Sequence, residues 1–546
     1  MTNRNPLHIL IACAAALILL LQPAKAQNTA FDLSKNLKLF SDIYRQLDTY
    51  YVDTLSADTA MRSAIDGMLQ EIDPYTGYFP AEDEELTSMT SGRYGGIGAL
   101  IRYYKREQRC IVEELYEGCP ADVAGVKPGD IILSINGHDT KGQGTSEVTK
   151  QLRGEAGTTF ELQVQRLGSD KPIAINITRQ QIQTPAVPWY GIVDEASHTG
   201  YLYLSSFTEG CAREVRHAFL EMRQAGMQRF ILDLRDNPGG AVSEAVQITG
   251  LFVPKGSLVV STKGKLPSTC YDYLSPSEPV DTLMPIAVMV SSNSASASEI
   301  VSGALQDFDR ALIVGQRTYG KGIVQSIHDV GSDGGSLKIT TARYYLPSGR
   351  CIQAFDYRRR ASGEAAVSLP DSLTHEFHTR HGRTVRDGGG VMPDSILPVD
   401  SLPTMVYDVM ASDVAMEYVN SYAASHPTIA PAGEFHITDA DYDEFCSAVL
   451  ASDFTSASRT IAALSQLRKI ANMEGLLDES RSEFDALEAR LKSNDVAADL
   501  VRNRHLIIPA IETDIAGRYY YIRGGLRQQL ASDKSLRRTI DILTEH

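Results

Sequence analysis

Strands and helices alternate through the middle of this 546-residue chain, and this alternation constrains its fold more than any other feature. The predicted strands are 201–204, 230–234, 285–290 and 311–314, and the predicted helices are 213–224, a stretch from about 241, and 296–307. Alternation at this spacing predicts a largely parallel sheet with helices packed on it. Because such sheets carry their chemistry in the loops after the carboxyl ends of strands, the loops to search are 235–240 and 291–296.

Residues 91–180 instead contain a series of short predicted β-strands. The predicted strands are 97–103, 110–115, 131–135, 160–166 and 173–177. The segment 120–137, with turn signals at Pro128-Gly129 and Asn136-Gly137, resembles the PDZ family. That resemblance makes Gly95-Gly96-Ile97-Gly98 a carboxylate-binding loop, whose backbone N–H groups converge on a peptide terminus while the peptide adds as a strand. The alternative is a PDZ fold that binds no peptide.

Both ends of the chain are predicted to be helical. Apolar residues recur at three- and four-residue steps from Phe31 to about Glu71, and again beyond about Leu402. The second region lacks catalytic motifs, so we expect it to be a structural or oligomerisation domain. The expected domains are 1–26 (signal peptide), 27–90 (helical), 91–180 (PDZ), 181–398 (catalytic core) and 399–546 (helical).

The N-terminus has the composition of a secretory signal. Arg4 supplies positive charge, 9–21 is apolar, and Ala24-Lys25-Ala26 fits the small-x-small cleavage rule. The apolar run is shorter than the ~20 residues that span a bilayer, which disfavours a membrane anchor. We therefore expect export to the periplasm or the extracellular space, with a soluble mature protein after removal of 1–26.

Composition argues against nucleic acid as the main partner and against a fold held together by disulfide bonds. A formal net charge of −16 disfavours nucleic acid as the main partner, because an acidic surface repels phosphate. No C-x-x-C pair occurs, and the cysteines are sparse for a disulfide scaffold, so free thiols are expected. The cysteines beyond residue 26 are Cys110, Cys119, Cys211, Cys270, Cys351 and Cys446.

Three segments carry residues that suit peptide hydrolysis. They are Leu232-Asp-Leu-Arg-Asp-Asn-Pro-Gly-Gly240, Ser294-Ala-Ser-Ala-Ser-Glu299, and Thr318-Tyr-Gly-Lys-Gly322 with Gln325 after it. Small residues in the second segment allow a sharp strand-to-helix turn that exposes a hydroxyl at a helix N-terminus. Each segment alone has an ordinary explanation, as helix-capping serines or as a common turn.

Together these segments resemble the carboxy-terminal-processing (tail-specific) peptidases of family S41, which are Ser/Lys proteases. The resemblance covers roughly 31–393 and implies Ser296 as nucleophile, Lys321 as base and Gln325 as the third active-site residue. Asp307 matches a further supporting position. The implied fold is α/β: a crotonase-like protease core with an inserted β-rich PDZ domain and helical N- and C-terminal regions.

The residue types fit that chemistry on physical grounds. A serine hydroxyl needs a base to take its proton during attack, and no triad motif surrounds any of the twelve histidines. Lysine serves as base only when neutral, so burial must lower the pKa of Lys321 from ~10.4. An amide such as Gln325 can orient the amine without adding a charge that would keep it protonated.

An oxyanion hole needs fixed N–H donors beside the nucleophile. The N–H of Ala297 is one candidate, and a second is expected from Gly239 or Gly240, where no side chain obstructs the substrate carbonyl. Asp233 and Arg235 are expected to be structural, pairing within the sheet or bracing the loop.

No cofactor or metal is expected. His375, His378 and His381 recur every third residue, which matches neither a zincin motif nor a tetrahedral Cys/His site. The segment 376–383 is expected to form a hairpin in which the histidines are incidental.

The leading hypothesis is an exported serine endopeptidase that cuts protein substrates recognised by their free C-termini. A catalytically silent PDZ adaptor is the alternative, and an acyl-CoA enzyme with the same core is disfavoured by export. The hypothesis also allows an activating adaptor protein, and assembly of the chain into a homo-oligomer through its C-terminal helices.

Overall fold

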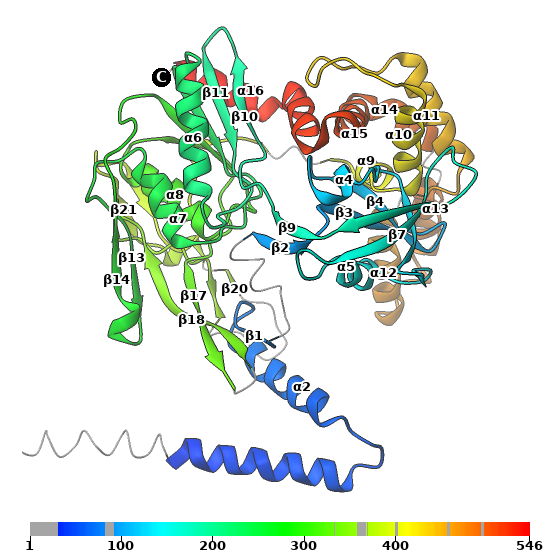
Figure 1. Ribbon diagram of the computed structural model, residues 1–546. Helices are drawn as coiled ribbons and strands as arrows, with labels where there is room; N and C mark the ends of the chain where they lie inside the picture. Colours follow the sequence, from blue (N-terminus) through cyan, green and yellow to red (C-terminus); the bar gives the residue numbers. More distant parts are fainter. Residues whose placement is uncertain are drawn as a thin grey trace, which may run out of the picture. The chain divides into compact units, whose positions relative to one another are not determined.

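The computed structural model describes residues 31–81, 92–331, 334–357, 367–368, 370–398, 402–455, 459–492 and 496–545 (Figure 1). The chain divides into two units by its contacts. The first comprises the residues up to Phe79 together with Ile327–Ile339, and the second comprises Pro80–Ser326 and Thr340–His546. The predicted signal peptide, 1–26, lies outside the described residues.

In the first unit, residues 31–50 are helical and are followed by α2 (Ala57–Gln70), in agreement with the helical periodicity. Ser56 begins α2, because its hydroxyl accepts the Thr59 N–H at 3.3 Å. After α2, β1 (Gly77–Phe79) pairs antiparallel with β18 (Gly335–Tyr345). The sequence patterns did not predict β1.

A six-stranded sheet organises the second unit, in the order β10-β11-β12-β15-β16-β23. Its strands are β10 (Trp189–Asp194), β11 (Thr199–Tyr203), β12 (Arg229–Asp233), β15 (Ile286–Val290), β16 (Leu312–Gly315) and β23 (Ser395–Ile396). The pairs from β11 to β23 are parallel and β10 runs antiparallel. The predicted largely parallel sheet is confirmed, with two edge strands that the alternation did not indicate.

Helices cover both faces of this sheet (Figure 1). They are α6 (Cys211–Gln224), α7 (Val242–Gly250), α8 (Ala297–Asp307) and α16 (Lys534–Glu545). Successive strand residues point to opposite faces. Leu232 and Val288 accordingly pack with α6, α7 and α8, whereas Ile231 and Met289 pack with α16. The last helix of the chain is therefore a layer of the central domain.

An antiparallel sheet flanks this core. Its strands in the second unit are β13 (Leu258–Gly264), β14 (Tyr271–Leu274), and parts of β17 (Ile323–Val330) and of β18. β13 pairs with β14 and β18, and β17 pairs with β18. Two short hairpins follow, β19 (Phe355–Asp356) with β20 (Val367–Ser368), and β21 (Glu376–His378) with β22 (Thr384–Arg386). The second confirms the hairpin expected over 376–383.

The β-rich domain contains a sheet in the order β3-β4-β5-β7-β8, with β6 paired to β5. Its elements are β2 (Arg93–Gly96), β3 (Ala99–Tyr104), β4 (Arg109–Leu115), α4 (Pro120–Val123), β5 (Ile131–Ile135), β6 (His138–Asp139), α5 (Thr145–Leu152), β7 (Thr159–Gln165), β8 (Ile173–Thr178) and β9 (Gln180–Gln183). β2 pairs antiparallel with β9. The five predicted strands are observed, each shifted by at most two residues.

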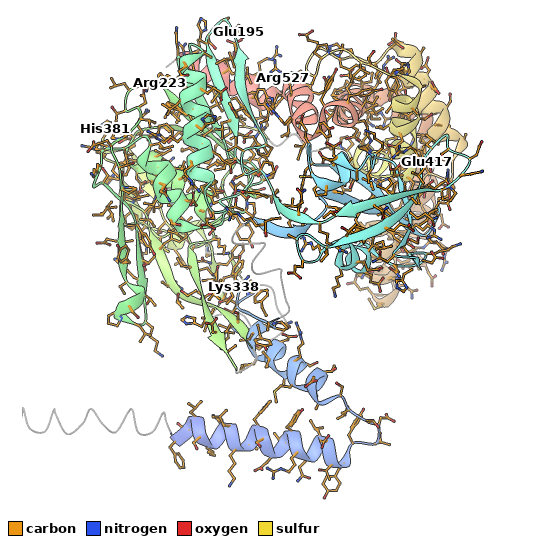
Figure 2. The ribbon with its side chains drawn as sticks, in the orientation of Figure 1. Glu195, Arg223, Lys338, His381, Glu417 and Arg527 are labelled. Carbon is orange, nitrogen blue, oxygen red and sulfur yellow. The ribbon has the colours of Figure 1, made fainter. Side chains whose placement is uncertain are left out.

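The remaining helices confirm the predicted helical C-terminal region. They are α9 (Thr404–Met410), α10 (Asp413–Ser425), α11 (Asp439–Ala451), α12 (Arg459–Met473), α13 (Arg481–Lys492), α14 (Val496–Arg502) and α15 (Arg504–Ser532). Glu417 of α10, labelled in Figure 2, accepts hydrogen bonds from the Tyr104 hydroxyl at 2.6 Å and from Arg106 at 2.8 Å. The C-terminal helices thus contact the β-rich domain through polar groups.

Two further observations concern the state of the cysteines and the search for membrane-spanning helices. All six cysteines in the described part are free thiols, as the sparse cysteine pattern predicted. Across the described ranges, no helix combines the length and the apolar character that crossing a bilayer requires.

Candidate active site

The turn between β15 and α8 presents Ser296 in an unusual backbone conformation. Ser296 has φ 57° and ψ −112°, a region that residues other than glycine rarely occupy. Its hydroxyl makes no capping hydrogen bond, since Glu299 N and Ile300 N bond instead to the Ser296 carbonyl at 2.9 and 3.0 Å. Helix capping by the hydroxyl, the ordinary explanation for such a cluster, therefore does not account for Ser296.

Glu299 connects this turn to the segment that carries Lys321. Its Oε2 accepts the Ser296 N–H at 2.8 Å and the Lys321 N–H at 2.9 Å. Its Oε1 accepts the Thr318 hydroxyl at 2.5 Å and the Gly320 N–H at 2.7 Å. One carboxylate thus fixes the backbone of both predicted catalytic residues.

Burial makes this carboxylate unusual electrostatically. Glu299 is fully buried, and desolvation raises its pKa to about 7, against the opposing effect of the four hydrogen bonds that it accepts. The sequence analysis did not identify Glu299 as a site residue. The Ser-x-x-Glu spacing of a capping box, Ser296 to Glu299, was the available signal.

Tyr344 of β18 links the same two residues through their carbonyl groups. Its hydroxyl lies 2.6 Å from the Lys321 carbonyl oxygen and 3.2 Å from the Ser296 carbonyl oxygen. The side chain is 1% exposed, and burial keeps its pKa well above the ordinary value, so the phenol stays protonated as a donor. Tyr344 was also missed, because it lies 48 residues beyond Ser296 in a strand that was not predicted.

The loop after β12 packs directly against the Ser296 turn. A β-carbon placed on Gly239 would lie 2.8 Å from Ser296 Cβ and 2.9 Å from Ala297 N, so only glycine fits. The Gly239 N–H donates to Asn237 Oδ1 at 2.9 Å. Gly240 has φ 145° and its neighbour Ala241 bonds to the Phe207 carbonyl. The two predicted loops therefore meet, as parallel strands that end at one sheet edge require.

Asp233 and Arg235 brace the start of this loop. The Arg235 Nε lies 3.0 and 2.9 Å from the two Asp233 carboxylate oxygens, and the Arg235 N–H donates to Asp233 Oδ1 at 2.9 Å. The expected structural pairing of these two residues is confirmed.

Gln325 lies close to Lys321 in the sequence, whereas Asp307 lies at the end of α8 that is far from the Ser296 turn. Gln325 lies on β17, four residues after Lys321, and donates to Thr340 Oγ1 at 3.1 Å. Asp307 ends α8, ~16 Å along the helix from Ser296. There Asp307 Oδ1 lies 2.9 Å from Arg350 Nη2, with both side chains 1% exposed, and Asp307 Oδ2 accepts the Ser348 N–H. Asp307 thus anchors the far end of the helix rather than meeting Ser296.

A groove in the β-rich domain lies between β3 and α5, with a volume of about 340 Å³. Its lining includes Gly96, Ile97 and Gly98 of the predicted carboxylate-binding loop, together with apolar Leu100 and Leu152. Gly95 instead lines a separate hollow of about 440 Å³. Gly95 and Gly96 belong to β2, which pairs with β9, so the loop proper is shorter than predicted.

The three histidines considered as a metal site are not gathered together. His375 contacts Asp387 at 3.1 Å and His381 contacts Asp309 at 3.6 Å, while His378 ends β21. In the parts of the chain that the structure describes, no group of three or more His, Cys, Asp or Glu side chains is arranged to hold a metal ion.

Sequence comparisons match three parts of the chain. Residues 198–356 match peptidase family S41, 111–166 match a PDZ domain, and 405–543 match the family described as probable PDZ-protease, C-terminal helical domain. The S41 match contains the Ser296 turn and the Lys321 segment, and the PDZ match lies in the β-rich domain.

Curated relatives extend these matches. A carboxy-terminal-processing protease of Bartonella bacilliformis is 36% identical over 345 residues, which are 62% of this chain and 77% of that protein. A probable CtpA-like serine protease of Staphylococcus aureus is 34% identical over 323 residues, which are 58% and 62% of the two chains. Among solved structures, the photosystem II D1 C-terminal processing protease is 26% identical, covers 69% of this chain and 97% of its own, and has a TM-score of 0.35. The chain belongs to peptidase family S41, as a carboxy-terminal-processing serine protease with a PDZ domain.

Proposed function

We propose that this protein is an exported serine endopeptidase that cleaves proteins captured by their C-terminal tails, with Ser296 as nucleophile and Lys321 as base. The observation that carries the proposal is the double connection between these two residues. Glu299 accepts both of their N–H groups, and the Tyr344 hydroxyl contacts both of their carbonyl oxygens. Such a connection fixes two backbones relative to each other, as a nucleophile–base pair requires.

The proposed reaction is acyl transfer to water. Ser296 Oγ attacks the scissile carbonyl carbon while its proton moves to Lys321 Nζ, which must be neutral beforehand. Collapse of the tetrahedral intermediate breaks the C–N bond, and Lys321 returns the proton to the leaving amine. Water, deprotonated by Lys321, then attacks the Ser296 ester. The bond between the acyl carbon and Ser296 Oγ breaks, and Lys321 returns the proton to Ser296 Oγ, which regenerates the enzyme.

The proposed oxyanion donors are the N–H groups of Ala297 and Gly240. Ala297 begins α8, where the helix dipole favours negative charge. The Gly239 N–H already donates to Asn237, so of the two glycine candidates we propose Gly240. Gln325 is proposed to orient the Lys321 amine, and Asp307 to anchor α8 through Arg350. The crotonase-like description of the core and the five domain boundaries given above belong to the same proposal.

Tail capture is proposed for the groove between β3 and α5. The backbone at Gly96, Ile97 and Gly98 would face the terminal carboxylate, and the pocket with Leu100 and Leu152 would take an apolar last side chain. Export through cleavage after residue 26 completes the proposal.

Mutation of the pair tests the proposed chemistry. Ser296→Ala and Lys321→Ala should each abolish cleavage of an unstructured protein substrate almost entirely, and the double variant should be no worse, because nucleophile and base act as a unit. Cleavage is measured by mass spectrometry of the products, with wild type as control. Substantial cleavage by Ser296→Ala would refute the assignment, and tail binding by the wild type without any cleavage would favour the silent adaptor.

A further inference from the structure

Both ends of α16 are held by arginines, one at the start of β12 and one in the loop that follows this strand. At the start of the helix, Asp533 Oδ2 lies 2.7 Å from Arg235 Nη2. At its end, the Leu543 carbonyl accepts a hydrogen bond from Arg229 Nε at 3.3 Å. Because Arg229 begins β12 and Arg235 follows its last residue, α16 runs antiparallel to β12 across the sheet face.

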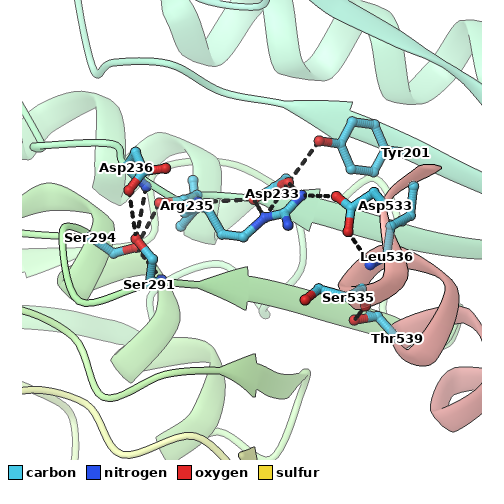
Figure 3. Close-up of polar contacts among 11 residues, drawn as sticks. Tyr201, Asp233, Arg235, Asp236, Ser291, Ser294, Asp533, Ser535, Leu536 and Thr539 are labelled. Atoms are coloured by element: carbon cyan, nitrogen blue, oxygen red, sulfur yellow. Dashed lines mark hydrogen bonds and ion pairs between the residues drawn. The ribbon is translucent and has the colours of Figure 1, made fainter. Parts of the chain in front are cut away.

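The Asp533 carboxylate performs two separate tasks. Its Oδ1 caps α16 by accepting the Leu536 N–H at 2.8 Å, and its Oδ2 pairs with Arg235 (Figure 3). Asp233 also binds that guanidinium and accepts the Tyr201 hydroxyl at 2.7 Å. The Asp533 and Arg235 side chains are only 12% and 26% exposed, so solvent screens their attraction little. Two carboxylates from distant segments of the chain thus fix one arginine.

Arg235 directly precedes the loop that packs on Ser296. The next residue, Asp236, has φ 60°, and its N–H donates to Ser291 Oγ at 3.0 Å (Figure 3). The following residue, Asn237, accepts the N–H of Gly239, which lies against the Ser296 turn. Arg235 is therefore only a few residues away from the contact with the Ser296 turn.

We propose that Asp533, acting through Arg235, positions the 236–240 loop against Ser296, so that the C-terminal helical domain completes the catalytic site. The S41 match ends at 356, whereas Asp533 lies in the separately matched segment 405–543. Asp533 is a positioning residue, because its contacts are to Arg235 and to the helix that it caps. The inference rests on the proposed function.

Asp533→Asn tests this inference, because asparagine still caps a helix but loses the charge that pairs with Arg235. We expect kcat to fall by about tenfold with KM within about twofold, since a displaced oxyanion donor weakens the transition state rather than substrate binding. Arg229→Gln is the matched control: it loosens the other end of α16, far from the loop, and should lower Tm while leaving kcat within about twofold of wild type.

Arg235→Lys and an inhibitor measurement give independent readouts. Arg235→Lys keeps the positive charge but loses the forked contact of the guanidinium. Its kcat should lie between that of wild type and that of Asp533→Asn. A peptide boronic acid, whose serine adduct mimics the tetrahedral intermediate, should bind Asp533→Asn about tenfold more weakly, while a C-terminal peptide binds the groove as in wild type.

The outcomes separate the inference from the function on which it rests. A wild-type kcat in Asp533→Asn, or an equal loss of kcat in Arg229→Gln, would overturn the positioning role of Asp533. If Ser296→Ala is inactive in the same assay, the assignment of Ser296 and Lys321 is unaffected. An active Ser296→Ala would overturn the proposed function itself. Combining Asp533→Asn with Arg235→Lys should cost less than the sum of the single losses, because both break one contact; strict additivity would contradict the link.

Discussion

At the scale of single residues, two opposing effects act on the ionisation of the Glu299 carboxylate. Its carboxylate accepts four hydrogen bonds at the Ser296 turn, and all four donors are best satisfied when it is ionised. Full burial opposes that ionisation and raises its pKa from 4.5 to about 7. Burial of this carboxylate therefore costs folding stability when Glu299 is ionised.

The pH dependence of stability should reveal this cost. Because the folded-state pKa is raised, the contribution of Glu299 to stability is fully present below pH ~4.5 and is lost as pH rises through about 7. Relative to Glu299→Gln, wild type should lose about 3 kcal/mol of unfolding free energy between pH 4.5 and 8. Urea unfolding of both proteins at several pH values measures this. A difference between them that does not change with pH would contradict the buried, titrating carboxylate.

At the scale of elements, α8 is fixed at both of its ends. Ser296 begins it in a strained conformation, and at its last residue Asp307 pairs with the buried Arg350. Burial raises the pKa of Asp307 and lowers that of Arg350, so each charge depends on the other for compensation.

Breaking this pair should destabilise the fold without altering the chemistry. Arg350→Met leaves Asp307 buried and unpaired, which should cost about 3–5 kcal/mol of unfolding free energy. The kcat of the folded fraction should remain near that of wild type, because Asp307 lies a helix length from Ser296. The double variant Arg350→Met/Asp307→Asn should recover part of the loss, because asparagine can still accept the Ser348 N–H. A folded Arg350→Met enzyme with little kcat would instead assign the pair a role at the dyad.

The elements also show what the sequence could and could not indicate. Strand–helix alternation placed the loops 235–240 and 291–296 at one sheet edge, because parallel strands share a direction, and Gly239 does lie against Ser296. Glu299 resembles an ordinary capping residue, and its contacts with Lys321 depend on how a later segment folds back. Tyr344 lies in β18, whose pairing with the distant strand β13 is set by tertiary packing rather than by a local pattern.

At the scale of the whole molecule, contacts between distant segments join the catalytic sheet to the C-terminal helices. Asp533 and Arg235 are 298 residues apart, and α16 covers the sheet face opposite α6, α7 and α8. A sequence pattern describes an amphipathic helix at 534–545 but does not name the sheet that it covers. One helix of the expected helical region 399–546, α16, therefore packs on the central sheet.

The tail recognition proposed above joins the groove between β3 and α5 to the proposed peptidase. If the backbone at Gly96 to Gly98 binds a terminal carboxylate, amidation of a substrate's C-terminus removes a charge-assisted hydrogen bond worth roughly 1.5–3 kcal/mol. Capture should weaken by about one to two orders of magnitude. The change should appear in KM if the groove only tethers substrate, and also in kcat if tail binding shifts the active fraction.

The comparison uses one peptide sequence as free acid and as amide, assayed on the full chain. Gly98→Ala is a matched variant, because Gly98 has φ 72° and a β-carbon there would lie 2.3 Å from Cys119 Cβ. This variant should reduce the preference for the free acid. Equal rates for acid and amide on wild type would remove the tail-reading role and leave the Ser296 chemistry standing.

Active-site labelling tests the central assignment most directly. A fluorophosphonate reacts only with a serine whose hydroxyl is activated, so peptide mapping of the labelled full chain should find the adduct on Ser296. Labelling should be lost in Lys321→Ala, because no base then takes the proton of the Ser296 hydroxyl. Label on another residue, or undiminished labelling of Ser296 in Lys321→Ala, would contradict the Ser296/Lys321 pair.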